Sequence, residues 1–239
     1  MKILVVNDDS IAAPGISLLA KAAAELGEVT VVAPAHQCSA MSQKLTLREV
    51  LAVEKVEDFS VNVQGAYRLD GTPVDCVKVA LDYILEDRPD YVFSGINNGY
   101  NVGFDIAYSG TLGAAFEAAR HGIPAIAFSV AGDHHLPSVE PYLLPVIQEL
   151  LEADMEWGTV WNVNFPAMKT VGLKGILRDR TVAPVSMFTE KYIETKLPDG
   201  RVVLTCQGIP ITNDQIPEGT DAKAVRNGYI AISKVKCIL

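Results

Sequence analysis

The chain has 239 residues, of which 49% are hydrophobic and 21% are charged, and its formal net charge is −9. These proportions are ordinary for a globular protein and exclude a disordered chain. At about 150 residues per domain, the length predicts one large domain, or one domain with an appendage. The negative charge argues against a broad surface for nucleic-acid polymers, although a local site can still hold a small anion.

No apolar run approaches the ~18 residues that a membrane span needs, so we expect no membrane association. The apolar run over residues 2–6 is too short for the core of a signal peptide, and we expect a cytoplasmic protein. The four cysteines include no Cys-x-x-Cys pair, which argues against a zinc ribbon or a thioredoxin-like redox site. We therefore expect the cysteines to be reduced.

The first 170 residues predict a doubly wound α/β core. Residues 2–6 form a continuous apolar run, which is typical of a strand buried on both faces. A helical pattern over 15–26 and a second strand over 29–33 follow, and this order predicts a sheet that begins parallel. The same alternation predicts a helical stripe at 74–85, strands at 91–94, 123–129 and 161–165, and helices at 111–120 and 139–152.

The pattern changes after about residue 180. Residues 192–197 and 201–205 flank the turn Pro198-Asp199-Gly200 and predict a β-hairpin, and no helix is predicted in this part. We expect residues 171–239 to be a β-rich C-terminal extension of the same structural domain, with a strand near 225–235 that returns to the core. Because an isolated two-stranded hairpin is marginal in water, we expect this one to pack on a neighbouring subunit.

Ligands of open parallel sheets bind outside the carboxyl ends of the strands, so polar residues there are candidate site residues. Asp8 and Asp9 directly follow the first strand. Two adjacent carboxylates repel each other, and a divalent cation would offset that repulsion; the alternative is an N-cap aspartate beside a solvated neighbour. Ser39 and Ser42 follow the second strand, where they either face the same crevice or are simply solvated.

Residues 94–103 are the most informative segment, since they follow a strand and contain three glycines and three asparagines. Glycines such as Gly95 let the backbone approach a ligand closely, and Asn97 and Asn101 offer a neutral oxygen ligand or an amide donor. The alternative is a long turn, in which both residue types are common.

The residues Ser109, Gly110 and Thr111 open the helix predicted at 111–120. A helix N-terminus presents free N–H groups and the positive end of its dipole, so this one can cradle a phosphate; the alternative is a plain Ser109 N-cap. The sequence has no Gly-x-Gly-x-x-Gly after the first strand, no Walker A loop, no His-Glu-x-x-His and no Gly-x-Ser-x-Gly. The adjacent His134 and His135 would point apart in an extended segment, so we do not expect them to bind a metal.

In this order along the chain, these segments resemble the survival-protein SurE family of metal-dependent nucleotide phosphatases. The match runs from residue 1 through about 130 and continues more weakly to the end. It implies a 5′-nucleotidase that hydrolyses nucleoside 5′-monophosphates to nucleoside and phosphate. The segments that carry it are Asn7-Asp8-Asp9, the serine loop at 39–46, Gly71-Thr72-Pro73, Ser94-Gly95-Ile96-Asn97 with Gly99, Asn101 and Gly103, and Ser109-Gly110-Thr111.

The resemblance also implies one divalent metal per subunit, held by Asp8, Asp9, Ser39 and Asn97. These are hard oxygen ligands, which suit Mg²⁺ or Mn²⁺ better than a metal that prefers thiolates. It implies a homodimer or a dimer of dimers. The residues expected to act in catalysis are Asp8, Asp9, Asn97 and Asn101, and those expected to bind the phosphate are Ser39, Ser42, Gly95, Asn101, Ser109, Gly110 and Thr111.

Two positions depart from the family pattern. Ser10 stands where the family usually has glycine, and Cys38 stands where a basic residue commonly precedes the metal-binding serine. The second departure removes a partner for the phosphate and bears on substrate preference. Neither touches the four expected metal ligands.

Three other functions compete with that of a metal-dependent nucleotidase. A receiver-like phospho-acceptor domain needs an aspartate at a central strand end and a lysine at a later one, where this chain has Asn97 and residues 129–131. An aspartyl-phosphate phosphatase needs Asp-x-Asp, but Asp8 and Asp9 are adjacent. A catalytically silent nucleotide-binding regulator is left open by the sequence.

Overall fold

The computed structural model describes residues 1–132, 136–167 and 172–237. Its helices are α1 (Pro14–Ala24), α2 (Pro73–Val79), α3 (Gly110–Arg120), α4 (Leu136–Leu151) and α6 (Asp221–Arg226), with short turns η1 (Ala80–Ile84), η2 (Gly103–Tyr108) and η3 (Asn213–Gln215). Its strands are β1 (Lys2–Val6), β2 (Glu28–Pro34), β3 (Val53–Lys55), β4 (Gly65–Leu69), β5 (Tyr91–Asn98), β6 (Ala125–Val130), β7 (Thr159–Phe165), β8 (Gly175–Leu177), β9 (Phe188–Lys196), β10 (Val202–Pro210) and β11 (Tyr229–Lys236).

The main sheet has nine strands in the order β3-β4-β2-β1-β5-β6-β7-β11-β8. The six strands from β4 to β7 pair in parallel, whereas β3 pairs antiparallel with β4 and β11 antiparallel with β7. The chain thus winds outward from β1 through β2 and β4, and later crosses to the opposite side of β1 with β5. The predicted fold class, a doubly wound and mostly parallel α/β sheet, is confirmed.

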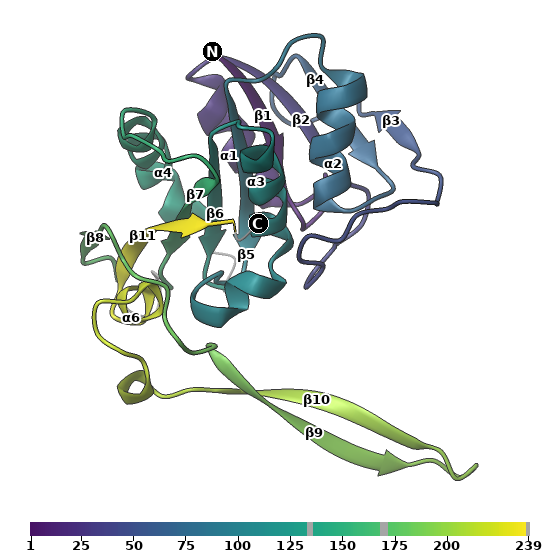
Figure 1. The fold of residues 1–239 in the computed structure, drawn as a ribbon, viewed down its shortest axis with the longest axis vertical. Coiled ribbons are helices and arrows are strands. Elements are labelled where there is room, and N and C mark those ends of the chain that lie inside the picture. Colours follow the sequence, from purple (N-terminus) through teal and green to yellow (C-terminus); the bar gives the residue numbers. More distant parts are fainter. Residues whose placement is uncertain (133–135, 168–171, 238–239) are drawn as a thin grey trace.

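Helices cover both faces of this sheet (Figure 1), and an apolar cluster fills each of the two layers between helices and sheet. A third, smaller cluster of buried residues packs around α6. Strand β1 contributes to both layers, because Ile3 and Val5 pack with α1 and α4, while Leu4 and Val6 pack with α2 and α3. Residues of a strand alternate between faces, so a strand covered on both sides must be apolar throughout. This explains the unbroken apolar run that predicted it.

Two helices differ from the prediction. The stripe predicted over 74–85 is α2 followed by the π-helical turn η1. Helix α4 begins at Leu136, three residues early, and continues through Pro141 and Pro145. Each proline removes one backbone hydrogen bond from the helix. The buried stripe outweighs that loss, and its members are Val139, Leu143, Val146, Ile147 and Leu150.

The prediction that no helix follows residue 180 is wrong, because α6 spans Asp221–Arg226. Thr220 caps it, its hydroxyl oxygen accepting from the Lys223 N–H at 3.3 Å. The buried Asp221 carboxylate accepts backbone N–H groups of Gly103 at 3.1 Å and Ala183 at 2.9 Å. Six residues are too few to show a helical period, so tertiary contacts stabilise a helix that periodicity does not indicate.

The predicted hairpin is present and longer than expected, since β9 and β10 pair from Phe188 with Pro210 to Lys196 with Val202. All eighteen residues of its strands are exposed, and the hairpin extends away from the rest of the molecule (Figure 1). Strand β11 returns to the main sheet between β7 and β8. The four cysteines are free, as predicted. No helix of the described residues is long and apolar enough to cross a membrane.

Candidate active site

The candidate site lies where the chain reverses its winding direction, between the carboxyl ends of β1 and β5. Asp8 and Asp9 lie just beyond the end of β1, and Asn97 is the penultimate residue of β5. Helix α3 begins beside them, because a Cβ atom at Gly110 would lie 3.0 Å from Cβ of Asp8. Open α/β sheets place their ligands at this reversal point, so the architecture itself brings the predicted residues to one crevice.

Asp8 is buried, with 5% of its surface exposed. Its Oδ1 accepts the hydroxyl hydrogen of Thr111 at 2.7 Å. Its backbone carbonyl accepts the N–H of Cys38 at 2.7 Å, which brings the neighbouring Ser39 to the same strand end. Three segments remote in sequence therefore meet at Asp8.

The negative charges of Asp8 and Asp9 are unfavourable in the protein without a bound cation. Burial raises the pKa of Asp8 from its ordinary 3.8 to about 6; the Thr111 hydrogen bond opposes this rise and the charge of Asp9 adds to it. Asp9 accepts the N–H of Asn98 at 2.8 Å and the amide of Gln37 at 3.2 Å. Among the described residues, no lysine, arginine or histidine forms an ion pair with Asp8 or Asp9.

This donor set fits a divalent cation. A buried, uncompensated carboxylate is costly unless a counter-charge is present. The Oδ1 atom of Asn7, next to Asp8 in sequence, is also buried without a hydrogen-bond partner among the described residues. The described residues contain no cluster of three or more His, Cys, Asp or Glu arranged for a metal, so two carboxylates would need neutral oxygen ligands to complete the set.

The serine loop, residues 39–46, is held in place by several contacts. The hydroxyl of Ser42 donates to the Ala107 carbonyl at 2.7 Å, and its N–H donates to the Tyr108 carbonyl at 3.0 Å. A side chain at Gly113 would collide with the Ser42 carbonyl, so α3 packs directly against the loop. Ser39 itself is exposed and available to a ligand, whereas the Ser42 hydroxyl is committed to the loop.

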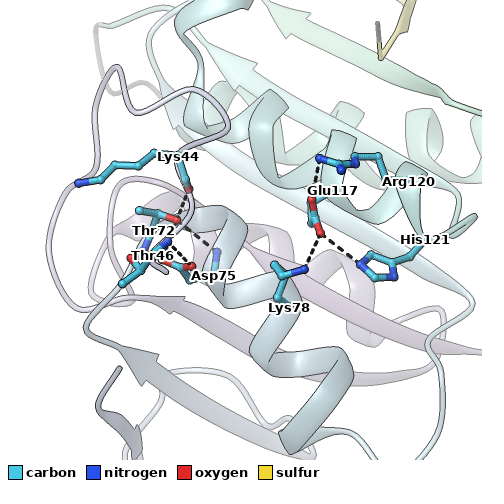
Figure 2. A network of polar contacts seen from close by, with 8 residues as sticks. All are labelled: Lys44, Thr46, Thr72, Asp75, Lys78, Glu117, Arg120 and His121. Carbon is cyan, nitrogen blue, oxygen red and sulfur yellow. Dashed lines mark hydrogen bonds and ion pairs between the residues drawn. The ribbon is translucent and has the colours of Figure 1, made fainter. Parts of the chain in front are cut away.

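Figure 2 shows how the far end of the serine loop is held to α2. The Asp75 carboxylate, 1% exposed, accepts the Thr46 hydroxyl at 2.7 Å, the Thr46 N–H at 3.0 Å and the Thr72 N–H at 2.9 Å. Gly71-Thr72-Pro73 therefore contributes through a capping box, which the motif did not reveal. Asp75 acts on the site through the loop and does not itself belong to the carboxylate pair.

A second polar cluster in Figure 2 surrounds the buried Glu117 of α3. Its carboxylate contacts Lys78 of α2 at 3.4 Å, His121 at 3.1 Å and Arg120 at 3.7 Å. Glu117 lies seven residues beyond Gly110, which is about 10 Å along the helix axis. The cluster joins α2 to α3 and is separate from the strand ends.

The predicted asparagines differ in their surroundings. The amide nitrogen of Asn97 donates to the Gly99 carbonyl at 2.9 Å, so its oxygen is the atom suited to a cation. Asn101 is 5% exposed, and its amide donates to Ser129 at 2.8 Å and to Thr111 at 3.4 Å. A side chain at Gly95 would collide with the Phe128 carbonyl, which gives that glycine a packing role.

The first residues of α3 combine capping with contacts to Asp8. The Ser109 hydroxyl accepts the Leu112 N–H at 3.1 Å and so caps the helix. The Thr111 hydroxyl orients Asp8, and Gly110 leaves the space that the Asp8 carboxylate needs. The backbone N–H groups of this first turn are the groups suited to an anion.

The sequence prediction missed a set of buried polar residues behind Asn101. Asn164 accepts the Asn101 N–H at 2.9 Å, and the amide of Asn162 donates to the Asn101 carbonyl at 2.8 Å. Both come from β7, where they alternate with buried apolar residues. Asparagine in a fully buried strand was the signal that could have identified them. His134 and His135 lie outside the described residues.

Comparison with known proteins gives consistent matches over most of the chain. The family model described as "Survival protein SurE" matches residues 3–186. A 5′-nucleotidase SurE of Flavobacterium psychrophilum is 39% identical over 98% of this chain and 91% of its own length. A 5′-nucleotidase SurE 1 of Thermus thermophilus is also 39% identical, over 98% and 91%. The crystal structure of the SurE protein from Aquifex aeolicus superposes with a TM-score of 0.85 at 34% identity, covering 100% of this chain and 94% of that one.

Proposed function

This chain belongs to the SurE family, and from that premise we propose that it is a metal-dependent 5′-nucleotidase that hydrolyses nucleoside 5′-monophosphates to nucleoside and phosphate. The observation that carries the proposal is the buried Asp8 carboxylate, which lies against the first turn of α3 and beside Asp9. Within the described part of the chain, neither carboxylate forms an ion pair with a lysine, arginine or histidine. A pair of acids next to anion-binding N–H groups suits a site that holds a cation and a phosphate together.

The finer part of the proposal is the identity of the metal and its ligands. We assign one Mg²⁺ or Mn²⁺ per subunit to Asp8, Asp9, Ser39 and Asn97. Asp8 and Asp9 would neutralise the charge of the ion, and the Ser39 hydroxyl and the Asn97 oxygen would complete a set of hard ligands. The contacts of Asp9 with Asn98 and Gln37 hold this carboxylate in place before an ion arrives.

The phosphate is assigned to the start of α3. The N–H groups of Gly110 and Thr111 would bind phosphate oxygens and stabilise the charge that develops in the transition state. Ser109 orders this turn as its cap, and Asn101 positions the Thr111 hydroxyl that donates to Asp8. Ser39 and Ser42 of the serine loop and Gly95 of β5 would border the phosphate.

The reaction places a different demand on each residue. When bound, the divalent cation would polarise the phosphoryl group and lower the pKa of a water molecule. Asp8 and Asp9 keep that charge at the strand end, while Asn97 and Asn101 maintain the geometry of the β5 loop. Burial of Asp8 strengthens its electrostatic interactions, because little water is present to screen them.

The competing function is a nucleotide-binding regulator without catalysis. Both functions need a nucleotide site, so binding alone does not separate them. Release of inorganic phosphate from a panel of nucleoside 5′-monophosphates does, when measured with Mg²⁺ or Mn²⁺ and again with EDTA. We expect turnover that EDTA abolishes and either metal restores. Nucleotide binding without phosphate release under any of these conditions would support the regulator instead.

Assembly is the remaining part of the proposal. We assign the exposed hairpin of β9 and β10 to contact with another copy of the chain, in a homodimer or a dimer of dimers. Its exposed apolar residues support this assignment, and they are Phe188, Tyr192, Ile193, Val202, Val203, Leu204 and Ile209. A closed two-fold dimer is the commonest assembly of soluble proteins.

A further inference from the structure

Four buried polar residues lie on the face of the sheet that α3 covers. They are Ser94 of β5, Ser129 of β6, and Asn162 and Asn164 of β7, and none of them has exposed surface. Their apolar neighbours along the strands, such as Phe128 and Val163, pack on the opposite face with α1 and α4. A polar side chain buried in a core layer costs free energy unless it is hydrogen-bonded, so the partners of these four residues indicate what they do.

The two asparagines of β7 hold the backbone of Asn101. The Oδ1 atom of Asn164 accepts the Asn101 N–H at 2.9 Å, and Nδ2 of Asn164 donates to the Asn101 carbonyl at 3.1 Å. Asn162 donates to the same carbonyl at 2.8 Å, and its Oδ1 accepts a hydrogen bond of 3.1 Å from Asn164. Asn101 lies between β5 and η2, outside any strand or helix. Side chains of β7 thus bind this segment as the backbone of a neighbouring strand would.

The side chain of Asn101 connects this support to the candidate active site. Its amide group has two hydrogens, and it donates to the hydroxyl of Ser129 at 2.8 Å and to the hydroxyl of Thr111 at 3.4 Å. Because Thr111 accepts from Asn101, its own single hydrogen is left to point at Oδ1 of Asp8, 2.7 Å away. Ser94 holds the backbone of Thr111 by donating to its carbonyl at 2.8 Å. A continuous series of hydrogen bonds therefore runs from β7 to Asp8.

We propose that Asn164 is a positioning residue for hydrolysis: it fixes the segment at Asn101 so that the Asp8 carboxylate keeps its orientation. This inference rests on the proposed function, which assigns that carboxylate to the metal. The hydrogen bonds of the Asn164 side chain go to Asn101 and Asn162, so Asn164 acts through other residues and is not itself catalytic. A displacement of about 1 Å at a reacting group costs up to about 100-fold in rate, so support from a distant strand matters for turnover.

The test variant is Asn164→Ala, which removes both hydrogen bonds to the Asn101 backbone. Val163→Ala is the matched control, because Val163 is the adjacent residue of β7, is equally buried and packs on the opposite face. Both variants leave a cavity in the core, so a loss of stability alone should affect them alike, and their melting temperatures check this. If Asn164→Ala does not fold, Asn162→Ala replaces it, since it removes only one hydrogen bond to Asn101.

The first measurement is independent of metal and of catalysis. Amide hydrogen exchange followed by mass spectrometry reports how often a segment opens. Exchange in the peptide that covers residues 97–103 should be at least tenfold faster in Asn164→Ala than in the parent. In Val163→Ala it should stay within threefold of the parent. Equal exchange in the two variants would overturn the proposal.

The second measurement tests whether the effect passes through Thr111. Thr111→Val removes the hydroxyl that donates to Asp8 while it preserves the shape of the side chain. Calorimetric titration of Mn²⁺ into the substrate-free protein should show a dissociation constant raised at least fivefold by either Thr111→Val or Asn164→Ala, because residues that orient a ligand carboxylate support metal affinity. Two variants that break the same series of contacts are not additive, so the double variant should bind within twofold of the weaker single variant.

An unchanged dissociation constant in Asn164→Ala, or losses that multiply in the double variant, would overturn the proposal. At saturating Mn²⁺, kcat for adenosine 5′-monophosphate should fall at least tenfold in Asn164→Ala with KM within threefold, and Val163→Ala should keep both parameters within twofold. Equal kcat values in the two variants would also overturn it. A parent that hydrolyses no nucleotide would reject the proposed activity, and the exchange and Mn²⁺ measurements would then decide whether Asn164 positions Asp8.

Discussion

Asp8 illustrates how a single residue can serve function at the expense of stability. It is buried beside a second carboxylate, and its raised pKa shows that the folded protein holds its negative charge less favourably than water does. The hydrogen bonds from Thr111 lower the pKa of Asp8 and so compensate only partly for its burial. A cation that binds the folded state would remove this disadvantage and stabilise the protein.

We therefore predict that Asp8→Asn makes the metal-free protein more stable at pH 7, by about 1–3 kcal/mol. In the folded parent Asp8 loses its proton near pH 6, but in the unfolded chain it does so near 3.8. The parent thus loses stability as the pH rises from about 4 to about 6, and Asp8→Asn lacks this loss. The advantage of the variant should vanish below about pH 4.

Urea unfolding with EDTA between pH 4 and pH 7 measures this difference, and Asp82→Asn on the exposed surface is the control. In the presence of Mn²⁺ the melting temperature of the parent should rise, and that of Asp8→Asn should not. A metal-free variant less stable than the parent at pH 7 would contradict the electrostatic account.

Ser10 has a backbone conformation that its side chain disfavours. It has φ +90°, a region that L-residues rarely adopt, at the position where the family usually has glycine. We predict that Ser10→Gly stabilises the protein by about 1 kcal/mol, because glycine adopts this backbone without strain.

Ser17→Gly is the control, because Ser17 lies within α1, where glycine is unfavourable. This variant should lower the stability of the protein by about 1 kcal/mol. Thermal unfolding of both variants gives the sign directly. Loss of stability in Ser10→Gly would mean that contacts of the serine side chain outweigh the backbone strain.

At the scale of elements, the serine loop depends on α2. Asp75 is buried in the first turn of that helix and holds Thr46 through the hydroxyl and the backbone N–H. The other end of the loop is held at Cys38 by the carbonyl of Asp8. Ser39 is thus kept at the strand end by anchors on both sides, although its own side chain is exposed.

We predict that Thr46→Val raises KM for nucleotides about three- to tenfold, because it removes the hydroxyl bond to Asp75 while it preserves the shape of the side chain. Loss of this hydrogen bond should make the ordered conformation of the loop less stable by about 1 kcal/mol. Thr46→Ser keeps the hydroxyl and should retain the parental KM. Steady-state kinetics at saturating metal make the comparison. A lower melting temperature with an unchanged KM would show that the contact serves only stability.

At the scale of the whole molecule, the hairpin of β9 and β10 has the fewest contacts that could stabilise it within one subunit. Both of its strands are exposed along their whole length, and it extends away from the body (Figure 1). Its base is closed by the buried Met187 and Ile211, whose backbones are joined by a hydrogen bond of 3.0 Å. The segment beyond this closure can therefore be removed without opening the core.

Replacing residues 188–210 with a short Gly-Ser linker should convert a dimer or dimer of dimers into a monomer that keeps the circular dichroism of a folded α/β core. The physical reason is that the deleted strands carry the exposed apolar surface and would contribute it to the subunit contact. Light scattering at micromolar concentration reports the assembly. A monomeric parent, or a truncated chain with the parental mass per particle, would contradict the assignment.

The sequence by itself determined the parallel core and the location of the candidate site. Both rest on local patterns, since β1 must be apolar to be buried on both faces, and Asp8, Asp9 and Asn97 lie at or just beyond the carboxyl ends of strands. Given a doubly wound sheet, the strand ends adjacent to one another are set by topology, so residues far apart in sequence can be assigned to one crevice. The hairpin was likewise evident from its turn.

Only the tertiary structure decided which side chains contact one another there. The hydrogen bonds of Asp75 to Thr46 and of Asn162 and Asn164 to Asn101 join residues 29, 61 and 63 positions apart in the chain. A pocket beside Asp9 is lined by residues from Asp9 to Leu136, and no local period in the sequence indicates any of these contacts. Helix α6 was not predicted for the same reason, because the hydrogen bonds to its Asp221 carboxylate come from residues distant in the sequence. Local sequence patterns determine which elements form and where each one ends, whereas the partner of each buried polar group depends on how those elements pack.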